Sequence, residues 1–520
     1  MRRIGIDVGG TNTDAVLVDG TTVKASVKVA TTTDIMTGIS RALAGVIKGP
    51  EASGQVEAVM VGTTRFTNAI VEGRNLDSVA CLRIGLPASR TLTPLVDWPS
   101  RLAKPVGGPV CCVEGGHEVD GRPLVALDEK AIAGFADRIA GSGCRNVAIA
   151  SIFSPLNRSC EERARDIIRG RLPDCRITLS ADIGRIGLLA RENAAILNAS
   201  LRPLAERFTR AMNDALGHAG LDARLYLTRN DGTVLLAEEA ERFPVFSLAC
   251  GPTNSMRGAA LLSGLDHGIV VDVGGTTSDV GMLEAGFPRE ANNVVTLSGI
   301  RTLFRMPDLI SIGLGGGSLV DEKAGTIGPA STGHEIDPRA RIFGGDDLTA
   351  SDLGVAGNRL DLGDRRHLAD LDPVTVDSLL GVASTMLADA IDRVKVRAGD
   401  VPVVAVGGGA FLVADDIWGA SEVIRVEHGA VANAVGAAMA QVSGECDRVF
   451  TGLARDETLR RARSEAEERA IAGGADARTL QTVDMEDLPL AYLPGNALRA
   501  RVRVVGDIAT QGQPSAVMPD

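Results

Sequence analysis

Aromatic residues and positive charge are both in short supply in this 520-residue sequence. Its 11 Phe, 2 Tyr and 2 Trp make up only 3% of the chain, so few side chains can stack on nucleobases. The 54 basic residues are outnumbered by 66 acidic ones, which gives a net charge of −12. Binding to nucleic acid requires a basic surface that neutralises phosphates, so we expect no nucleic-acid partner.

Cysteine is also sparse. None of the eight cysteines forms a CxxC pair, and only Cys111 and Cys112 are adjacent, which argues against a disulfide scaffold. Met1 leads directly into a strand-like segment without the apolar core of a signal peptide. No uninterrupted apolar stretch approaches the roughly 18 residues that cross a membrane. We therefore expect a cytoplasmic protein in a reducing compartment, with no membrane partner.

Three widespread sequence motifs are absent: the P-loop GxxxxGK[ST], the dinucleotide-binding GxGxxG and the hydrolase GxSxG. The corresponding P-loop, Rossmann and nucleophile-elbow interpretations lose their main support. The six histidines show neither HxxxH nor HExxH spacing. Only His334, in a polar segment near a glycine-rich loop, is retained as a candidate contact for a substrate or metal.

Glycine, in contrast, is abundant, with 61 residues. Short apolar runs rich in β-branched residues alternate with helical patterns, and this alternation predicts an α/β architecture. The runs expected to be strands are 3–8, 56–61, 146–152, 268–273, 401–406 and 501–505. The segments expected to be helices are 34–47, 128–140, 188–216, 253–262, 373–396, 431–442 and 455–472.

One internal repeat stands out. Residues 6–14 read IDVGGTNTD, and residues 271–279 read VDVGGTTSD. Each copy follows an apolar run and leads into another, a pattern typical of a strand, a tight glycine turn and a second strand. Two copies so far apart predict two related α/β lobes and not a short-period solenoid. We expect the boundary near the long helix that begins at residue 188.

Each copy places an acidic residue at the end of a buried strand, before two glycines and several hydroxyl residues. The glycines permit positive φ angles and a concave nest of N–H groups that suits phosphate oxygens. Asp7 and Asp272 are poorly placed against bare phosphate, so they predict a bridging Mg²⁺. Hydroxyl groups that could add donors belong to Thr11, Thr13, Thr276 and Ser278. Two ordinary glycine-turn hairpins are the alternative, and the match between the copies argues against it.

A third glycine cluster ends the apolar run at 401–406. Gly407, Gly408 and Gly409 leave room for the flat face of a nucleoside, where larger side chains would clash. A simple strand-to-helix turn explains the same residues equally well, so this cluster gains weight only beside the repeat.

These residues resemble the sugar kinase, Hsp70 and actin superfamily of ATPases, and within it the hydantoinase A/5-oxoprolinase family. The family's GTT-x-x-TNA segment is similar to residues 61–69, although Val61 stands where the family usually has His. The other segments that carry the likeness are 230–238, 251–252, 305–313, 315–318 and 344–352. Their order is consistent over roughly residues 3–445.

The resemblance implies two RNase H-like lobes that clamp Mg-ATP in a cleft between two phosphate hairpins. The implied domains are an N-terminal lobe (1–187), a second lobe (188–450) and a C-terminal extension (451–520). The phosphate-binding residues would be Gly9, Gly10, Thr11, Asn12, Thr13, Gly274, Gly275, Thr276, Thr277 and Ser278, with adenosine held by Gly407, Gly408 and Gly409. Asp7 and Asp272 would organise Mg²⁺ and the attacking group.

The resemblance also suggests residues on the substrate side. These are Thr63, Thr64, Asn68, Ser311, Gly315, Gly316, Gly317 and Ser318. A polar turn after a strand explains Thr63 and Thr64 without a substrate, and a structural loop explains the glycines.

The implied activity is ATP-dependent hydrolysis of a cyclic amide such as 5-oxoproline or a hydantoin. Transfer of the γ-phosphoryl group to the amide oxygen would create an activated imidate that water can attack. No hydantoinase B-like component is present in the sequence, so a separate subunit is the expected partner, and a homo-oligomer is a further expectation. A small-molecule kinase or an ATP-dependent carboxylase subunit is the alternative, since one fold hosts many activities. An Hsp70-like switch and a ROK-type repressor lack their expected additional modules here.

Overall fold

Two sheets that contain the same arrangement of five strands organise the molecule. The computed structural model describes residues 1–9, 12–30, 35–48, 55–184, 186–291, 295–303, 306–491 and 495–509. The first lobe contains β1 (Arg2–Val8), β2 (Asn12–Asp19), β3 (Thr22–Ala30), β4 (Ala58–Thr63) and β9 (Arg224–Thr228). The second contains β11 (Gly268–Val273), β12 (Ser278–Glu284), β13 (Phe287–Pro288), β16 (Leu309–Ile312), β19 (Val401–Val406) and β20 (Ala420–Arg425).

The strand orders are β3-β2-β1-β4-β9 and β13-β12-β11-β19-β20. In each sheet an antiparallel hairpin gains an antiparallel strand on one side and two parallel strands on the other. This repeated topology, predicted from the two sequence copies, confirms the α/β fold with two RNase H-like lobes.

Helices cover both faces of each lobe, because side chains on a strand alternate between faces. In β2, Ala15 and Leu17 join the core beneath α1 (Ile35–Ile47) and α6 (Leu188–His218), while Val16 and Val18 pack against α12 (Ala432–Met439). In the second lobe, β11 packs between α11 (Pro373–Val394) and α8 (Cys250–Ser263). The predicted helix 431–442 is too long, because Val442 begins a strand.

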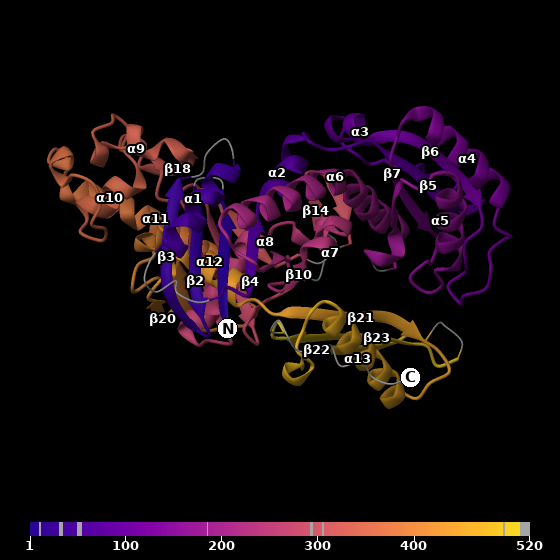
Figure 1. The fold of residues 1–520 in the computed structure, drawn as a ribbon. Helices are drawn as coiled ribbons and strands as arrows, with labels where there is room; N and C mark the ends of the chain where they lie inside the picture. The colour runs from indigo at the N-terminus through magenta and orange to yellow at the C-terminus, as the bar shows by residue number, and fades with distance from the viewer. Residues whose placement is uncertain are drawn as a thin grey trace.

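A separate four-stranded sheet, order β6-β5-β7-β8, is inserted into the first lobe. Helix α2 (Arg65–Glu72) leads into this insertion. Its strands are β5 (Val79–Leu86), β6 (Gly107–Glu114), β7 (Asn146–Ser151) and β8 (Arg176–Leu179), and its helices are α3 (Ser100–Val106), α4 (Glu129–Ser142) and α5 (Ser159–Arg171). The buried pair Arg83–Glu192 ties this sheet to α6. Figure 1 places it at the opposite end of the molecule from α9 (Ile336–Arg339) and α10 (Ala350–Ala356).

The C-terminal segment forms an antiparallel sheet and one helix. Its elements are β21 (Val442–Phe450), α13 (Arg455–Ala472), β22 (Gln481–Pro489) and β23 (Leu498–Gly506), and β21 joins the first lobe's sheet through β10 (Val234–Leu236). The remaining elements are α7 (Ala237–Arg242), β14 (Val295–Leu297), β15 (Ile300–Thr302), β17 (Ser318–Asp321) and β18 (Thr326–Ser331). The domain boundaries proposed from the sequence stay a prediction.

By length and composition, α11 is the one helix of the described residues that could cross a membrane. Its apolar side chains, among them Val376, Leu380, Leu387 and Ile391, are instead buried against the second lobe's sheet. A core helix of this kind satisfies the same test.

The two lobes meet where α8, α12 and β1 pack without room for side chains. A Cβ on Gly436 of α12 would lie 1.9 Å from the carbonyl oxygen of Asn254 in α8, and one on Gly258 would lie 1.9 Å from the carbonyl oxygen of Ala432. A Cβ on Gly5 of β1 would lie 2.1 Å from the carbonyl oxygen of Ala434. Glycine at these positions therefore sets the distance between the helices and the sheet.

Replacing Gly436 with Ala should lower the free energy of unfolding by about 3 kcal/mol, because the methyl group would overpack backbone that cannot move aside. Gly381→Ala in α11 is the matched control, since a Cβ there meets nothing within 4 Å. That variant should be stabilised by about 0.5–1 kcal/mol through helix propensity. Chemical denaturation measures both, and equal effects in the two variants would contradict this packing.

Candidate active site

The two glycine turns are built alike. Asp7 pairs with Asp14 across the first hairpin, and Asp272 pairs with Asp279 at the same register position of the second. Each turn closes with a 2.9 Å hydrogen bond, from Gly9 N to the Asn12 carbonyl and from Gly274 N to the Thr277 carbonyl. The sequence repeat is therefore a repeat of backbone geometry that ends in a carboxylate on each side.

Asp7 is held by amide groups from both crossing helices. Its Oδ1 accepts a hydrogen bond from Asn254 Nδ2 (2.9 Å) and its Oδ2 accepts one from Asn433 Nδ2 (3.1 Å). A Cβ on Gly62 of the neighbouring strand would lie 2.3 Å from both Asp7 Oδ1 and Asn254 Nδ2. The carboxylate is consequently fixed in one orientation at the end of β1.

Burial raises the pKa of Asp7 to about 6, and the two asparagine donors oppose that rise. Asp14, its cross-strand neighbour, adds to the rise and is itself paired with Lys28, whose Nζ lies 2.7 Å from Asp14 Oδ1. Asn433 Nδ2 also donates to Asp14 (2.9 Å). Lys28 is thus the cation that partly compensates this buried acidic pair.

Asp272 carries less compensation. Burial raises its pKa to about 7, and the charges of Asp279 and Asp7 add to the rise, while a hydrogen bond from Ser255 opposes it. The contribution of Asp7 places the two lobes' carboxylates within electrostatic reach of each other. Gly407 must be glycine here, because it has φ +86° and a Cβ would lie 2.4 Å from Asp272 Oδ1.

The second turn rests on the predicted glycine-rich loop. Gly316 N donates to the Gly274 carbonyl (2.9 Å), and Gly317 N donates to the Gly275 carbonyl (2.7 Å). Within the described part of the chain, the N–H groups of Gly275 and Thr276 have no hydrogen-bond partner. These free donors beside Asp272 suit an anion that carries a cation with it.

The sequence predicts positive φ angles at the glycines of both turns. This prediction is wrong for Gly9 and Gly274, whose φ angles are not positive. The cross-turn hydrogen bonds close both turns without them. Glycine is needed instead for close approach: a Cβ on Gly315 would lie 2.6 Å from the carbonyl carbon of Gly275 and from Thr276 N.

The predicted phosphate residues divide by exposure. Thr13 and Ser278 are fully buried, and Ser278 Oγ donates to the Leu314 carbonyl (2.6 Å), so its hydroxyl braces the turn. Thr276 and Thr277 are partly or fully exposed at the tip. Gly10 and Thr11, which were predicted for the same role, lie outside the described residues.

The predicted substrate residues fall in two places. Thr64 lies against the first turn, since its N and Oγ1 both contact the Val8 carbonyl at 3.4 Å, and exposed Asn68 follows it in α2. Thr63 is buried, and its Oγ1 accepts from Arg65 N (3.2 Å). On the other lobe, the exposed Ser311 hydroxyl donates to Asp279.

The remaining predicted substrate residues, Gly315, Gly316, Gly317 and Ser318, are buried beneath the second turn. Ser318 Oγ accepts a hydrogen bond from Gly315 N (2.8 Å). This loop supports the turn, as the structural alternative from the sequence expects, and contact with a substrate stays a prediction.

The third glycine cluster is next to the second turn. Gly409 N donates to the Val273 carbonyl (2.8 Å), and a Cβ on Gly409 would lie 2.5 Å from Val273 Cγ1. Gly408 is exposed with open space around it. A flat ligand face can reach the cluster at Gly408, so its assignment to adenosine stays a prediction consistent with the geometry.

Three residues around Asp7 escaped the sequence analysis: Asn254, Asn433 and Lys28. Asn254 lies two residues after the 251–252 segment that was singled out, so its neighbourhood was visible although its role was not. Asn433 and Lys28 lie in segments without a motif, and only the folded arrangement brings them to the carboxylates.

Comparison with protein families identifies the chain. Residues 3–172 match the hydantoinase/oxoprolinase N-terminal region, and residues 191–364 match the hydantoinase/oxoprolinase family itself. The chain belongs to the hydantoinase/oxoprolinase family. Each matched region contains one of the two glycine turns described above.

Proteins similar to this chain in sequence include two enzyme subunits. The caprolactamase subunit alpha of Pseudomonas jessenii is 25% identical over 395 residues, covering 68% of this chain and 54% of the relative. The acetophenone carboxylase gamma subunit of Aromatoleum aromaticum is 26% identical over 395 residues, covering 68% of this chain and 53% of the relative. The chain thus spans about half the length of these relatives.

Solved structures agree on the fold. The ATP-dependent caprolactamase from Pseudomonas jessenii superposes with a TM-score of 0.77 at 18% identity, and nucleotide-free acetone carboxylase with 0.65 at 19%. Each superposition covers 98% of this chain and 88% of the other. At these identities the likeness establishes the two-lobed architecture.

The raised pKa of Asp272 predicts a pH dependence of stability in the nucleotide-free protein. Between the unfolded value of 3.8 and the folded value of about 7, the folded state binds more protons, so the free energy of unfolding falls as pH rises through this window. The contribution of Asp272 to the free energy of unfolding is complete below the unfolded pKa and is lost above the folded pKa. Between these two pKa values the free energy of unfolding falls by at most about 1.4 kcal/mol per pH unit.

Asp272→Asn should flatten this slope in denaturation curves recorded from about pH 4 to about pH 8. Asp377→Asn, which replaces an exposed carboxylate on α11, is the control and should leave the slope unchanged. If the free energy of unfolding varies with pH in the same way in wild type and Asp272→Asn, the pKa of Asp272 is not raised and the account of this carboxyl group is wrong.

Proposed function

We propose that the chain catalyses the ATP-dependent opening of a cyclic amide by phosphoryl activation of the amide carbonyl, as one subunit of a larger enzyme. The observation that carries the proposal is the pair of matched glycine turns, each ending beside a carboxylate whose pKa is raised. On the second turn, backbone N–H donors have no partner among the described residues. Membership of the hydantoinase/oxoprolinase family supports this reaction class.

ATP bound between the turns would supply the phosphoryl group that makes a resonance-stabilised amide carbonyl susceptible to water. The chain's part is positioning and charge stabilisation. Asn254 and Asn433 fix the orientation of Asp7, while the N–H groups of Gly275 and Thr276 offer donors to phosphate oxygens. Thr64 and Asn68 line the first-turn side, where a small amide would meet the activated group.

Mg²⁺ fits this site on electrostatic grounds. The pKa values of Asp7 and Asp272 are raised because burial leaves their charges short of compensation, and a cation between them would relieve that deficit. The described residues contain no group of three or more His, Cys, Asp or Glu side chains that could hold a metal alone. Mg²⁺ commonly takes only one or two carboxylates and fills its remaining positions with water and phosphate oxygens.

A carboxylase subunit is the second candidate, because one relative is the acetophenone carboxylase gamma subunit and one structural neighbour is acetone carboxylase. With a ketone, the phosphoryl group would pass from ATP to the enolate oxygen after loss of an α-proton, with ADP leaving. The enol phosphate formed would supply the nucleophilic carbon that carboxylation needs. The caprolactamase and acetophenone carboxylase relatives are both named as subunits, which supports a separate partner chain. A hydantoinase B-like partner, a homo-oligomer and a cytoplasmic location stay predictions.

Phosphate release from ATP by the purified chain tests the proposal, measured with Mg²⁺ alone and with 5-oxoproline, hydantoin, caprolactam or acetophenone added. A cyclic amide should stimulate release, and Asp7→Ala and Asp272→Ala should each abolish the stimulation. Stimulation by the ketone with bicarbonate, and by no amide, would favour the carboxylase. Absence of ATP binding by calorimetry would contradict both candidates.

A further inference from the structure

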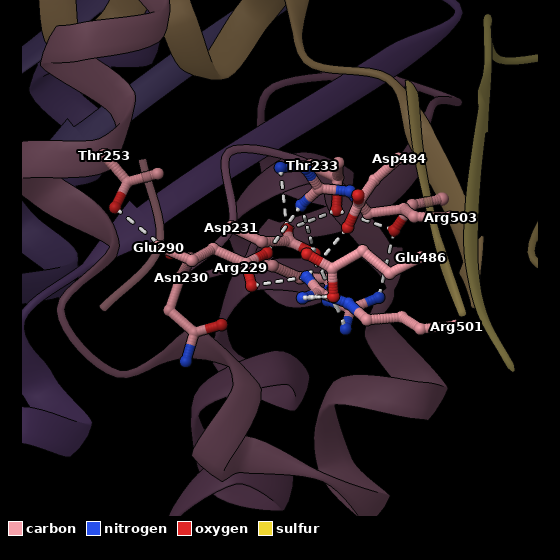
Figure 2. Close-up of polar contacts among 11 residues, drawn as sticks. Arg229, Asn230, Asp231, Thr233, Thr253, Glu290, Asp484, Glu486, Arg501 and Arg503 are labelled. Atoms are coloured by element: carbon pink, nitrogen blue, oxygen red, sulfur yellow. Dashed lines mark hydrogen bonds and ion pairs between the residues drawn. The ribbon is translucent and has the colours of Figure 1, made fainter. Parts of the chain in front are cut away.

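A buried ion network joins the C-terminal extension to both lobes, through Asp231 after β9 of the first and Glu290 after β13 of the second. Arg503 of β23 lies 3.0 Å from Glu290 and 4.0 Å from Asp231, and Arg501 lies 2.6 Å from Glu290. The side chains of Arg503 and Asp231 are only 7% and 2% exposed. Figure 2 shows both guanidinium groups reaching from the extension toward the acids of the body.

Asp231 is the anchor of this network on the body's side. Its carboxylate accepts hydrogen bonds from Thr233 N (3.1 Å) and Thr233 Oγ1 (2.6 Å), and Arg229 lies 3.7 Å away. The neighbouring cations Arg229 and Arg503 hold the pKa of Asp231 at about 2 against the effect of burial. The buried carboxylate is therefore held by short hydrogen bonds from Thr233, with Arg229 and Arg503 as the cations that balance its charge.

The segment that ends in Asp231 also holds the first turns of α8. Thr228 Oγ1 accepts a hydrogen bond from Asn254 Nδ2 (3.2 Å). Thr253 Oγ1 lies between two acceptors, the Asn230 carbonyl (3.4 Å) and the Ala249 carbonyl (3.3 Å). Asn254 Nδ2 is the same group that donates to Asp7 Oδ1 (2.9 Å). One short segment thus contacts the ion network at one end and the partner of the active-site carboxylate at the other.

We propose that Arg503 is a positioning residue for the active site. By fixing Asp231 it fixes the 228–231 segment, and that segment fixes Asn254 against Asp7. The inference rests on the proposed function, since Asp7 is taken as an active-site carboxylate. It gives the C-terminal extension, for which the sequence suggests no role, a part in the geometry of a site on another element.

The energetics of burial support a positioning role over a purely stabilising one. A buried ion pair often contributes little net stability relative to apolar residues of similar size, because desolvation offsets the attraction. Its geometry is nevertheless strict, since each charge needs its partner. Arg503 also lies over the ring of Phe287 (5.3 Å), which confines the guanidinium further.

Steady-state ATP hydrolysis and hydrogen exchange test the proposal on Arg503→Met and on the near-isosteric Asp231→Asn. Each variant should lower kcat roughly tenfold with KM for ATP almost unchanged, because displacement of a reacting group costs rate more than binding. In the nucleotide-free protein, backbone exchange in peptides covering residues 249–256 should be faster. Arg503→Lys, which keeps the charge, should recover part of both effects.

Two control variants separate positioning from docking. Arg499→Met removes a paired arginine on the same face of β23, whose partner Asp447 (2.7 Å) lies on the adjacent strand β21. Glu290→Gln weakens the docking contacts of Arg501 and Arg503 but leaves Asp231 with its partners. Both should keep wild-type kcat and wild-type exchange at 249–256.

The outcomes distinguish this inference from the proposed function. If wild type hydrolyses ATP and Arg503→Met, Asp231→Asn and Glu290→Gln lose activity equally, docking alone matters and the inference is wrong. If wild type shows no ATP turnover under any condition, the proposed function fails, and the exchange measurement still decides whether Arg503 controls the 249–256 segment. Unchanged exchange in both Arg503→Met and Asp231→Asn overturns the inference in either case.

Discussion

The close contact of α8, α12 and β1 is the constraint on which the site depends. Backbone atoms approach so closely at Gly5, Gly258 and Gly436 that no side chain can enter. This contact carries Asn254 and Asn433 to opposite oxygens of one carboxylate, that of Asp7. Protein interiors are close-packed and transmit small displacements, so the helix crossing determines the geometry of the carboxylate directly.

The two turns share a backbone but differ in their surroundings. Asp7 has two amide donors and lies near the ion pair of Lys28 with Asp14, whereas Asp272 has a hydroxyl donor and a higher pKa. The second turn is in addition braced by the loop through Gly316 and Gly317. The first lobe therefore presents an oriented carboxylate. The second presents a supported turn whose N–H donors have no partner in the described part of the chain, and an acid that needs a counter-charge.

Much of this could be predicted from the sequence, because the decisive signals are local. The repeat at residues 6–14 and 271–279 contains strand, turn and strand within nine residues, and its copies have the same register in the structure. The apolar run 146–152 was correctly expected to be a strand, but its membership in a separate inserted sheet depends on pairing with β5 and β8, which no local pattern specifies.

The hydrogen-bond partners of Asp7 could not be predicted either, because no local pattern specifies a contact between distant segments. Asn433 is more than 400 residues from Asp7 in the chain, and an asparagine on a helix carries no signal of its partner. The glycines at 315–317 were recognised as important, but a run of glycines looks the same in a loop that touches a ligand and in one that supports the neighbouring turn. Only the hydrogen bonds to Gly274 and Gly275 reveal the supporting role.

The most direct test of the account is a crystal structure of the chain with Mg²⁺ and a nonhydrolysable ATP analogue. The account predicts the β- and γ-phosphates between the first and second glycine turns, with the metal beside Asp7 and Asp272 and the base near Gly408. Nucleotide bound instead in the 890 Å³ cavity lined by Arg229, Phe246 and Ser443 would contradict it, as would an empty cleft at saturating analogue.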